Sequence, residues 1–106
     1  MNNEFEAIID PFLDKDKKVT KIPRKRKKLI CVLMYLSDKF DPHKEYKESE
    51  VNEILNNWHT FNDYATLRRL LYDMGFLNRD KSGSVYKLSE DAPSLNDFDL
   101  WIKGNH

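Results

Sequence analysis

The sequence has few of the residues that form cross-links or metal sites. It contains one cysteine and three histidines among 106 residues. A single cysteine excludes an intrachain disulfide, and Cys31 lies inside an apolar run, where a free thiol behaves as a small core residue. His43, His59 and His106 do not have the spacing of metal ligands to one another or to Cys31. We therefore predict no metal site and no cofactor.

Long apolar runs are also missing. The longest one extends from Leu29 to Leu36, far shorter than the roughly 20 residues that a membrane-spanning helix requires. The amino terminus has no basic segment followed by an apolar one, so it does not resemble a secretory signal. Together with the lack of cysteine pairs, these features predict a cytoplasmic protein without a membrane partner.

Motifs for catalysis are absent from the sequence as well. Its many carboxylates form no catalytic motif with a nucleophile, and its three glycines form no phosphate-binding loop. We therefore expect no enzymatic activity and assign no catalytic residue. A chain of this length fits one domain with one modest core. These limits favour a binding role.

The net charge of zero conceals a strong segregation of charge. Nine basic residues and one acid lie between Lys15 and Lys28, whereas six acids and three lysines lie between Leu29 and Asn62. Such segregation produces a local field even when the total charge cancels. The basic segment favours an anionic partner, and the balanced total favours a protein partner.

The spacing of apolar residues predicts the helices. Positions three and four apart are apolar over 3–13, 23–40, 48–58 and 63–74, and a short C-terminal helix is expected over 94–103. Pro23 suits the first turn of its helix, where a missing N–H has no cost. Asn62 or Asp63 is expected to cap the fourth helix, and Gly75 to end it.

Short extended segments separate these helices. Residues 45–47 predict a very short strand, and segments 76–79 and 84–88 predict a hairpin joined by turn residues. The order of helix, short strand, helix, tight turn, helix and hairpin is that of a winged helix-turn-helix. We therefore predict an α+β, mostly α fold with a three-helix core, a β-hairpin wing and extra N- and C-terminal helical segments.

One domain is expected over residues 1–106. Its predicted parts are an N-terminal helix (1–14), a basic linker with a short strand (15–22), a winged-helix core (23–88) and a C-terminal segment (89–106). The apolar residues of both terminal segments either pack on the domain or form the interface of a homodimer.

Several motifs match a known family. They are the Ile-Pro-Arg-Lys-Arg-Lys-Lys run at 22–28, the Tyr-x-Glu-x-Glu-Val-Asn pattern at 46–52, Asp63 followed by Leu67-Arg68-Arg69 and Gly75, and the hairpin residues Arg79 and Tyr86. Over residues 12–88 the chain resembles the domain-of-unknown-function 2087 family. The resemblance implies a winged-helix-like domain that occurs alone or appended to bacterial transcriptional regulators, and it implies no known reaction or ligand.

Lys47 departs from the pattern of that family, which usually has serine or threonine there. Such a residue would cap the following helix in a reciprocal pair with Glu50. We expect lysine to lose this reciprocal bond.

Five adjacent basic residues are the first candidate for a nucleic-acid contact. They are Arg24, Lys25, Arg26, Lys27 and Lys28. As phosphate contacts they would release counterions from the nucleic acid. The alternative is a solvated basic surface, paired in part with acids of the next helix.

The helix over 63–74 is the second candidate, because it occupies the position of the reading helix. Its apolar stripe leaves Thr66 and Arg69 facing outward, where they would meet base edges or phosphates. Arg68 lies at the flank and either joins this contact or bridges back to Glu50 or Glu53. Alternatively, Arg69 pairs with Asp73 four residues on, and that acid would repel a phosphate.

The hairpin supplies the last candidates, Arg79 and Lys81. A lysine at the tip of a wing suits contact with a nucleic-acid backbone, although exposed hairpins are commonly charged for other reasons. The sequence thus predicts a nucleic-acid-binding module of the transcriptional-regulator type, with double-stranded DNA as its partner. The alternative is a non-catalytic protein–protein interaction domain of winged-helix shape.

Overall fold

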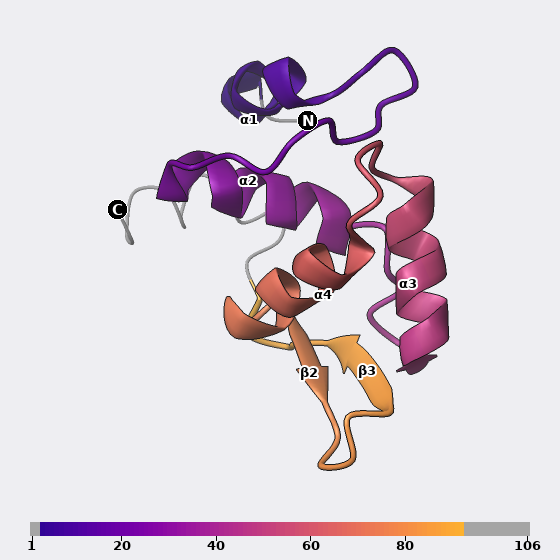
Figure 1. Ribbon diagram of the computed structural model, residues 1–106. Coiled ribbons are helices and arrows are strands. Elements are labelled where there is room, and N and C mark those ends of the chain that lie inside the picture. The colour runs from indigo at the N-terminus through magenta and orange to yellow at the C-terminus, as the bar shows by residue number, and fades with distance from the viewer. Residues whose placement is uncertain (1–2, 93–106) are drawn as a thin grey trace.

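The computed structural model describes residues 3–92 and is mostly helical, with one small sheet (Figure 1). In chain order the elements are α1 (Asn3–Ile9), the 3-10 helix η1 (Asp10–Phe12), α2 (Arg26–Ser37), β1 (Tyr46–Lys47), α3 (Glu48–Asn57), α4 (Tyr64–Asp73), β2 (Leu77–Arg79) and β3 (Val85–Leu88). This order confirms the predicted α+β fold class. The predicted helix over 94–103 lies outside the described residues.

The three strands form one antiparallel sheet in the order β1-β3-β2. Tyr86 is the shared neighbour, because it pairs with Tyr46 of β1 on one side and with Arg79 of β2 on the other. Figure 1 shows the β2–β3 hairpin projecting beyond α4, while α1 lies over α2 on the opposite side. The arrangement is winged-helix-like, with the hairpin in the place of the wing.

The N-terminal helix is shorter than the predicted 3–13. The α-helical part ends at Ile9, and a 3-10 turn that contains Pro11 continues to Phe12. Proline cannot supply the N–H that an α-helical bond would need here, which explains the early end. Phe5, Ile9 and Phe12 are nevertheless buried, so the N-terminal apolar residues pack on the domain.

Helix α2 begins three residues later than predicted. Lys25 is the residue before its first turn and has an extended backbone with φ of −75° and ψ of 135°, so Pro23 lies outside the helix. No side chain caps this end, and the adjacent positive charges oppose the helix dipole. The helix also ends early, at Ser37, whose hydroxyl donates to the Met34 carbonyl at 2.9 Å.

Helices α3 and α4 each begin and end within one residue of the predicted 48–58 and 63–74. The carboxylate of Glu50 accepts from the Lys47 N–H at 2.8 Å, but an ammonium has no lone pair to accept in return, so half of the capping box is made. Asp63 caps α4 by accepting from the Thr66 N–H at 3.3 Å. Gly75 follows α4 with a φ of +84°, a conformation that glycine adopts without a steric penalty.

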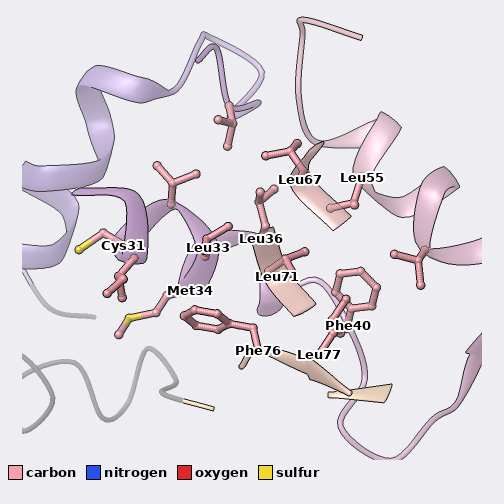
Figure 2. Close-up of a cluster of buried hydrophobic side chains, with 14 of the residues drawn as sticks. Cys31, Leu33, Met34, Leu36, Phe40, Leu55, Leu67, Leu71, Phe76 and Leu77 are labelled. Carbon is pink, nitrogen blue, oxygen red and sulfur yellow. The ribbon is translucent and has the colours of Figure 1, made fainter. Parts of the chain in front are cut away.

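The core lies where α2, α3, α4 and the hairpin meet. Figure 2 shows Leu33 and Leu36 of α2 beside Leu71 of α4, with Phe76 below them. Helix α2 buries residues on nearly all sides, because α4 covers one face and α1 another. Its apolar middle is thus covered within the chain. No helix in residues 3–92 is long and apolar enough to cross a bilayer.

Cys31 provides a chemical test of this packing. Its side chain is fully buried, and desolvation raises the pKa of the thiol to about 11 from an ordinary value of 9.0, against the opposing effect of Lys27. Two pKa units leave about 100-fold less thiolate at neutral pH, and the thiolate is the reactive form. We expect iodoacetamide to label Cys31 at least that much more slowly in native than in urea-unfolded protein. Equal labelling rates would contradict the buried position.

Candidate nucleic-acid interface

A groove lies between α4 and the hairpin. It has a volume of about 610 Å³ and is lined by Glu48, Ala65, Arg68, Arg69, Tyr72, Asp73, Arg79, Ser82, Gly83 and Tyr86. Leu67 and Leu71 are fully buried and turn the other side of α4 into the core. The helical period then places Arg69, as predicted, and also Tyr72 on the exposed side.

Strand alternation directs Arg79 toward this groove. Residues two apart on a strand share a face, so Arg79 lies on the same face as buried Leu77 and opposite Tyr86. Its guanidinium carbon is 4.3 Å from the centroid of the Tyr72 ring. Side-chain hydrogen bonding with Tyr86, and then with Tyr72, raises the pKa of Arg79. The guanidinium thus lies against the uncharged ring of Tyr72, beside its cross-strand neighbour Tyr86.

Arg68 is tied to α3. Its Nη2 is 2.8 Å from Glu48 Oε1, and its Nη1 donates to the side-chain oxygen of Asn52. The Arg68 side chain retains only 20% of its exposure. Of the two alternatives that the sequence leaves open for Arg68, the structure shows the bridge back to the preceding helix, but the expected partners, Glu50 and Glu53, are wrong. The acid in reach is Glu48, at the first turn of α3.

Arg69 pairs with Asp73 along the surface of α4. The distance from Arg69 Nε to Asp73 Oδ2 is 3.5 Å, and the side chains are 83% and 52% exposed. This is the predicted pair of residues four apart. Thr66 is also exposed on α4, although it does not line the groove.

The turn of the hairpin is built around Asp80. Its carboxylate accepts from the Ser84 N–H at 2.9 Å, the Val85 N–H at 3.2 Å and the Ser82 hydroxyl at 3.0 Å. These bonds, that of Val85 first, lower the pKa of Asp80 from its ordinary 3.8. Lys81 is exposed in this turn and, like Thr66, does not line the groove.

Acidification should loosen this turn. Because the folded pKa of Asp80 lies below 3.8, its stabilising bonds are complete above that pH and are lost as the pH falls through the lower, folded value. We expect the amide NMR signals of Ser84 and Val85 to shift in that acid range. In Asp80→Asn, which does not titrate, the same signals should keep their positions. A wild-type titration identical to that of the variant would exclude this role of Asp80.

The basic run lies apart from the groove. All five residues are exposed, at or just before the start of α2, namely Arg24, Lys25, Arg26, Lys27 and Lys28. Figure 1 places the start of α2 and the loop of the hairpin at separate ends of the molecule. Within residues 3–92, none of the five forms an ion pair. The predicted site residues thus fall into two groups, and the structure brings only Arg68, Arg69 and Arg79 into one groove.

Sequence reasoning missed several groove residues. Tyr72 and Tyr86 support Arg79, while Glu48 pairs with Arg68 and Ser82 lines the wall. The alternation from Leu77 to Arg79 was a usable signal, because it predicts that the arginine shares the inward face of the strand. The partner of Arg68 had no such signal.

Metal chemistry finds no support in the described part of the chain. Residues 3–92 contain no group of three or more histidine, cysteine, aspartate or glutamate side chains placed to hold a metal ion. His59, one of the scattered histidines, is a core residue with both ring nitrogens hydrogen-bonded.

Comparison with known proteins identifies a family. Residues 18–88 match the family described as an uncharacterized protein conserved in bacteria, DUF2087. No curated protein and no solved structure matches the chain. The match spans about two thirds of the sequence, from just before the basic run to the end of β3, and includes every groove residue. The chain therefore belongs to the DUF2087 family of uncharacterized bacterial proteins.

Proposed function

We propose that this domain binds double-stranded DNA, with the groove between α4 and the hairpin facing the phosphate backbone. The observation that carries the proposal is the meeting of Arg68, Arg69 and Arg79 in one groove. Guanidinium groups suit phosphate because their planar forks donate paired hydrogen bonds to its oxygens. In winged-helix and related folds the helix at the position of α4 enters the major groove. A regulator-like role follows from this mode of binding.

The exposed face of α4 supports the same proposal. Thr66 and Arg69 are exposed on the side that would face a duplex, and the hydroxyl and guanidinium groups can contact base edges or phosphates. The exposed run from Arg24 to Lys28 would supply a second, separate phosphate contact. Lys81 at the tip of the hairpin would lie along the backbone.

Salt dependence is the test of this proposal. We expect fluorescence anisotropy with a labelled random-sequence duplex to report binding whose affinity falls by about 0.9 log units per decade of salt for each phosphate contacted. Binding that does not weaken with salt, or no binding at low salt, would overturn the proposal.

Two variants locate the interface. If Arg24→Gln with Lys25→Gln abolishes binding while Arg79→Gln changes nothing, the contact lies at the start of α2 and not in the groove.

A protein-interaction role is the second candidate, and one observation favours it. Two of the three groove arginines are already paired with acids, Arg68 with Glu48 and Arg69 with Asp73. A groove of mixed charge suits the polar rim of a protein interface. Concentration-dependent dimerisation in sedimentation velocity, disrupted by substitutions in the groove and without DNA binding, would support this role and reject the first.

A further inference from the structure

The three arginines of the groove differ in how their charge is compensated. The Arg79 guanidinium lies over the ring of Tyr72, and Tyr86 pairs with Arg79 across the sheet. Neither tyrosine carries a charge that would cancel that of the guanidinium. An arginine side chain normally loses much rotamer freedom when it binds, and a guanidinium that is already held loses less. Arg79 therefore keeps its full positive charge in a position that the Tyr72 ring favours.

Arg68 is compensated and held. Its contacts with Glu48 and Asn52 fix α4 against α3, and its low exposure makes those contacts part of the packing. If Arg68 moved to a phosphate, its partly buried contacts with Glu48 and Asn52 would break, which would cost free energy. Its role is structural.

Arg69 is compensated but not held. Its pair with Asp73 is highly exposed and longer than a hydrogen bond, so the pair itself contributes little and breaks easily. The carboxylate of Asp73, however, remains beside any phosphate that Arg69 would contact. That negative charge repels the phosphate and cancels most of the gain.

We propose that Arg79 is the dominant phosphate-binding residue of the groove, positioned by Tyr72 and Tyr86, and that Asp73 suppresses a second contact by Arg69. The inference rests on the proposed DNA binding and adds to it which arginine acts and what restrains the others. The groove then makes one strong phosphate contact. The number of phosphates contacted is measured by the slope of log affinity against log salt concentration.

The first test compares two single-charge variants in the same hairpin. Arg79→Gln and Lys87→Gln each remove one positive charge, but Lys87 pairs with Asn78 and lies on the opposite face of the strand. We expect Arg79→Gln to weaken binding to the random-sequence duplex about tenfold and to lower the salt slope by about 0.9, and Lys87→Gln to change the slope much less. Equal effects of the two substitutions would show that only total charge matters.

The positioning role of Tyr72 needs its own readout. Tyr72→Leu removes the ring under the guanidinium but keeps every charge, so we expect lower affinity with an unchanged salt slope. Tyr72→Phe keeps the ring and should restore most of the affinity. If Tyr72→Leu changes the slope as Arg79→Gln does, or if Phe and Leu are equally impaired, the ring does not act through Arg79.

The restraint by Asp73 is tested by removing its charge. Asp73→Asn should raise the affinity and increase the slope by about 0.9, and this gain should vanish when Arg69→Gln is added. All substituted side chains are exposed, and circular dichroism checks that each variant folds. If wild-type protein binds DNA but neither Arg79 nor Asp73 affects the slope, this inference fails and the proposed function stands. If wild-type protein does not bind DNA at low salt, the proposed function fails first.

Discussion

Phe76→Ala is expected to lower the free energy of unfolding by about 3–5 kcal/mol, the usual cost of deleting a buried phenylalanine ring. Phe76 is 1% exposed and is the largest of the fully buried side chains. Its main chain also joins α4 to the hairpin, because its N–H donates to the Leu71 carbonyl at 2.8 Å and its carbonyl accepts from the Ser89 N–H at 3.0 Å. Small domains have a total stability of roughly 5–15 kcal/mol, so the loss is a large fraction.

The matched control is Tyr72→Ala in the same region. Tyr72 is an aromatic residue of α4 that is 39% exposed, so its removal opens no internal cavity and should cost about 1 kcal/mol or less. Phe76→Leu should lie between the two, since it leaves a smaller void. Urea unfolding followed by circular dichroism measures all three. Similar costs for Phe76→Ala and Tyr72→Ala would contradict the packing around Phe76.

Much of this core was predictable because its signals are local. The spacing of Val51 and Leu55 in α3, and of Leu67 and Leu71 in α4, is set by the helical period, and all four are fully buried. The cap at Asp63 and the glycine after α4 are equally local. Such features depend on neighbours within one or two turns, so a single sequence contains them.

The start of α2 was not predictable from the same kind of reasoning. Pro23 fits the first turn of a helix, yet α2 begins only at Arg26, after Lys25 with its extended backbone. The two local preferences conflict here, because proline favours a helix start whereas the following positive charges oppose the helix dipole. Pro23 itself is buried, so tertiary packing settles its conformation.

The sequence predicted the arginines of the candidate site, but not all of the side chains that each arginine contacts. The helical period correctly exposes Arg69 beside Asp73, because that pair belongs to one helix. The contact of Arg68 with Glu48 joins two helices, and the stacking of Arg79 on Tyr72 joins a helix and a strand. Which charges remain uncompensated is therefore a property of the assembled fold. For the same reason the sequence could not separate the basic run from the groove.

His59→Leu is expected to lower the free energy of unfolding by about 1–3 kcal/mol, although leucine is apolar and the site is buried. The ring of His59 is 5% exposed, with Nδ1 2.6 Å from the Leu55 carbonyl oxygen, while Nε2 accepts from the Asp63 N–H at 2.8 Å. These partners place the ring proton on Nδ1. Leucine would leave the Asp63 N–H at the start of α4 without its partner, whereas the Leu55 carbonyl would keep only its bond from the Trp58 N–H at 3.0 Å. The unpaired N–H and the lost bond both cost free energy.

His43→Leu is the matched control, since it makes the same substitution at an exposed loop residue and should change stability by no more than about 0.5 kcal/mol. Chemical unfolding of both variants gives the comparison, and equal losses of stability would show that the hydrogen bonds of His59 do not contribute to stability.

Measuring DNA binding by the same variants separates effects on stability from effects on function. His59 acts at the start of α4, whereas Arg79 lies on the hairpin beside Tyr72, further along that helix. Under conditions where His59→Leu remains folded, we therefore expect its salt slope to match that of the wild type, while the slope of Arg79→Gln falls.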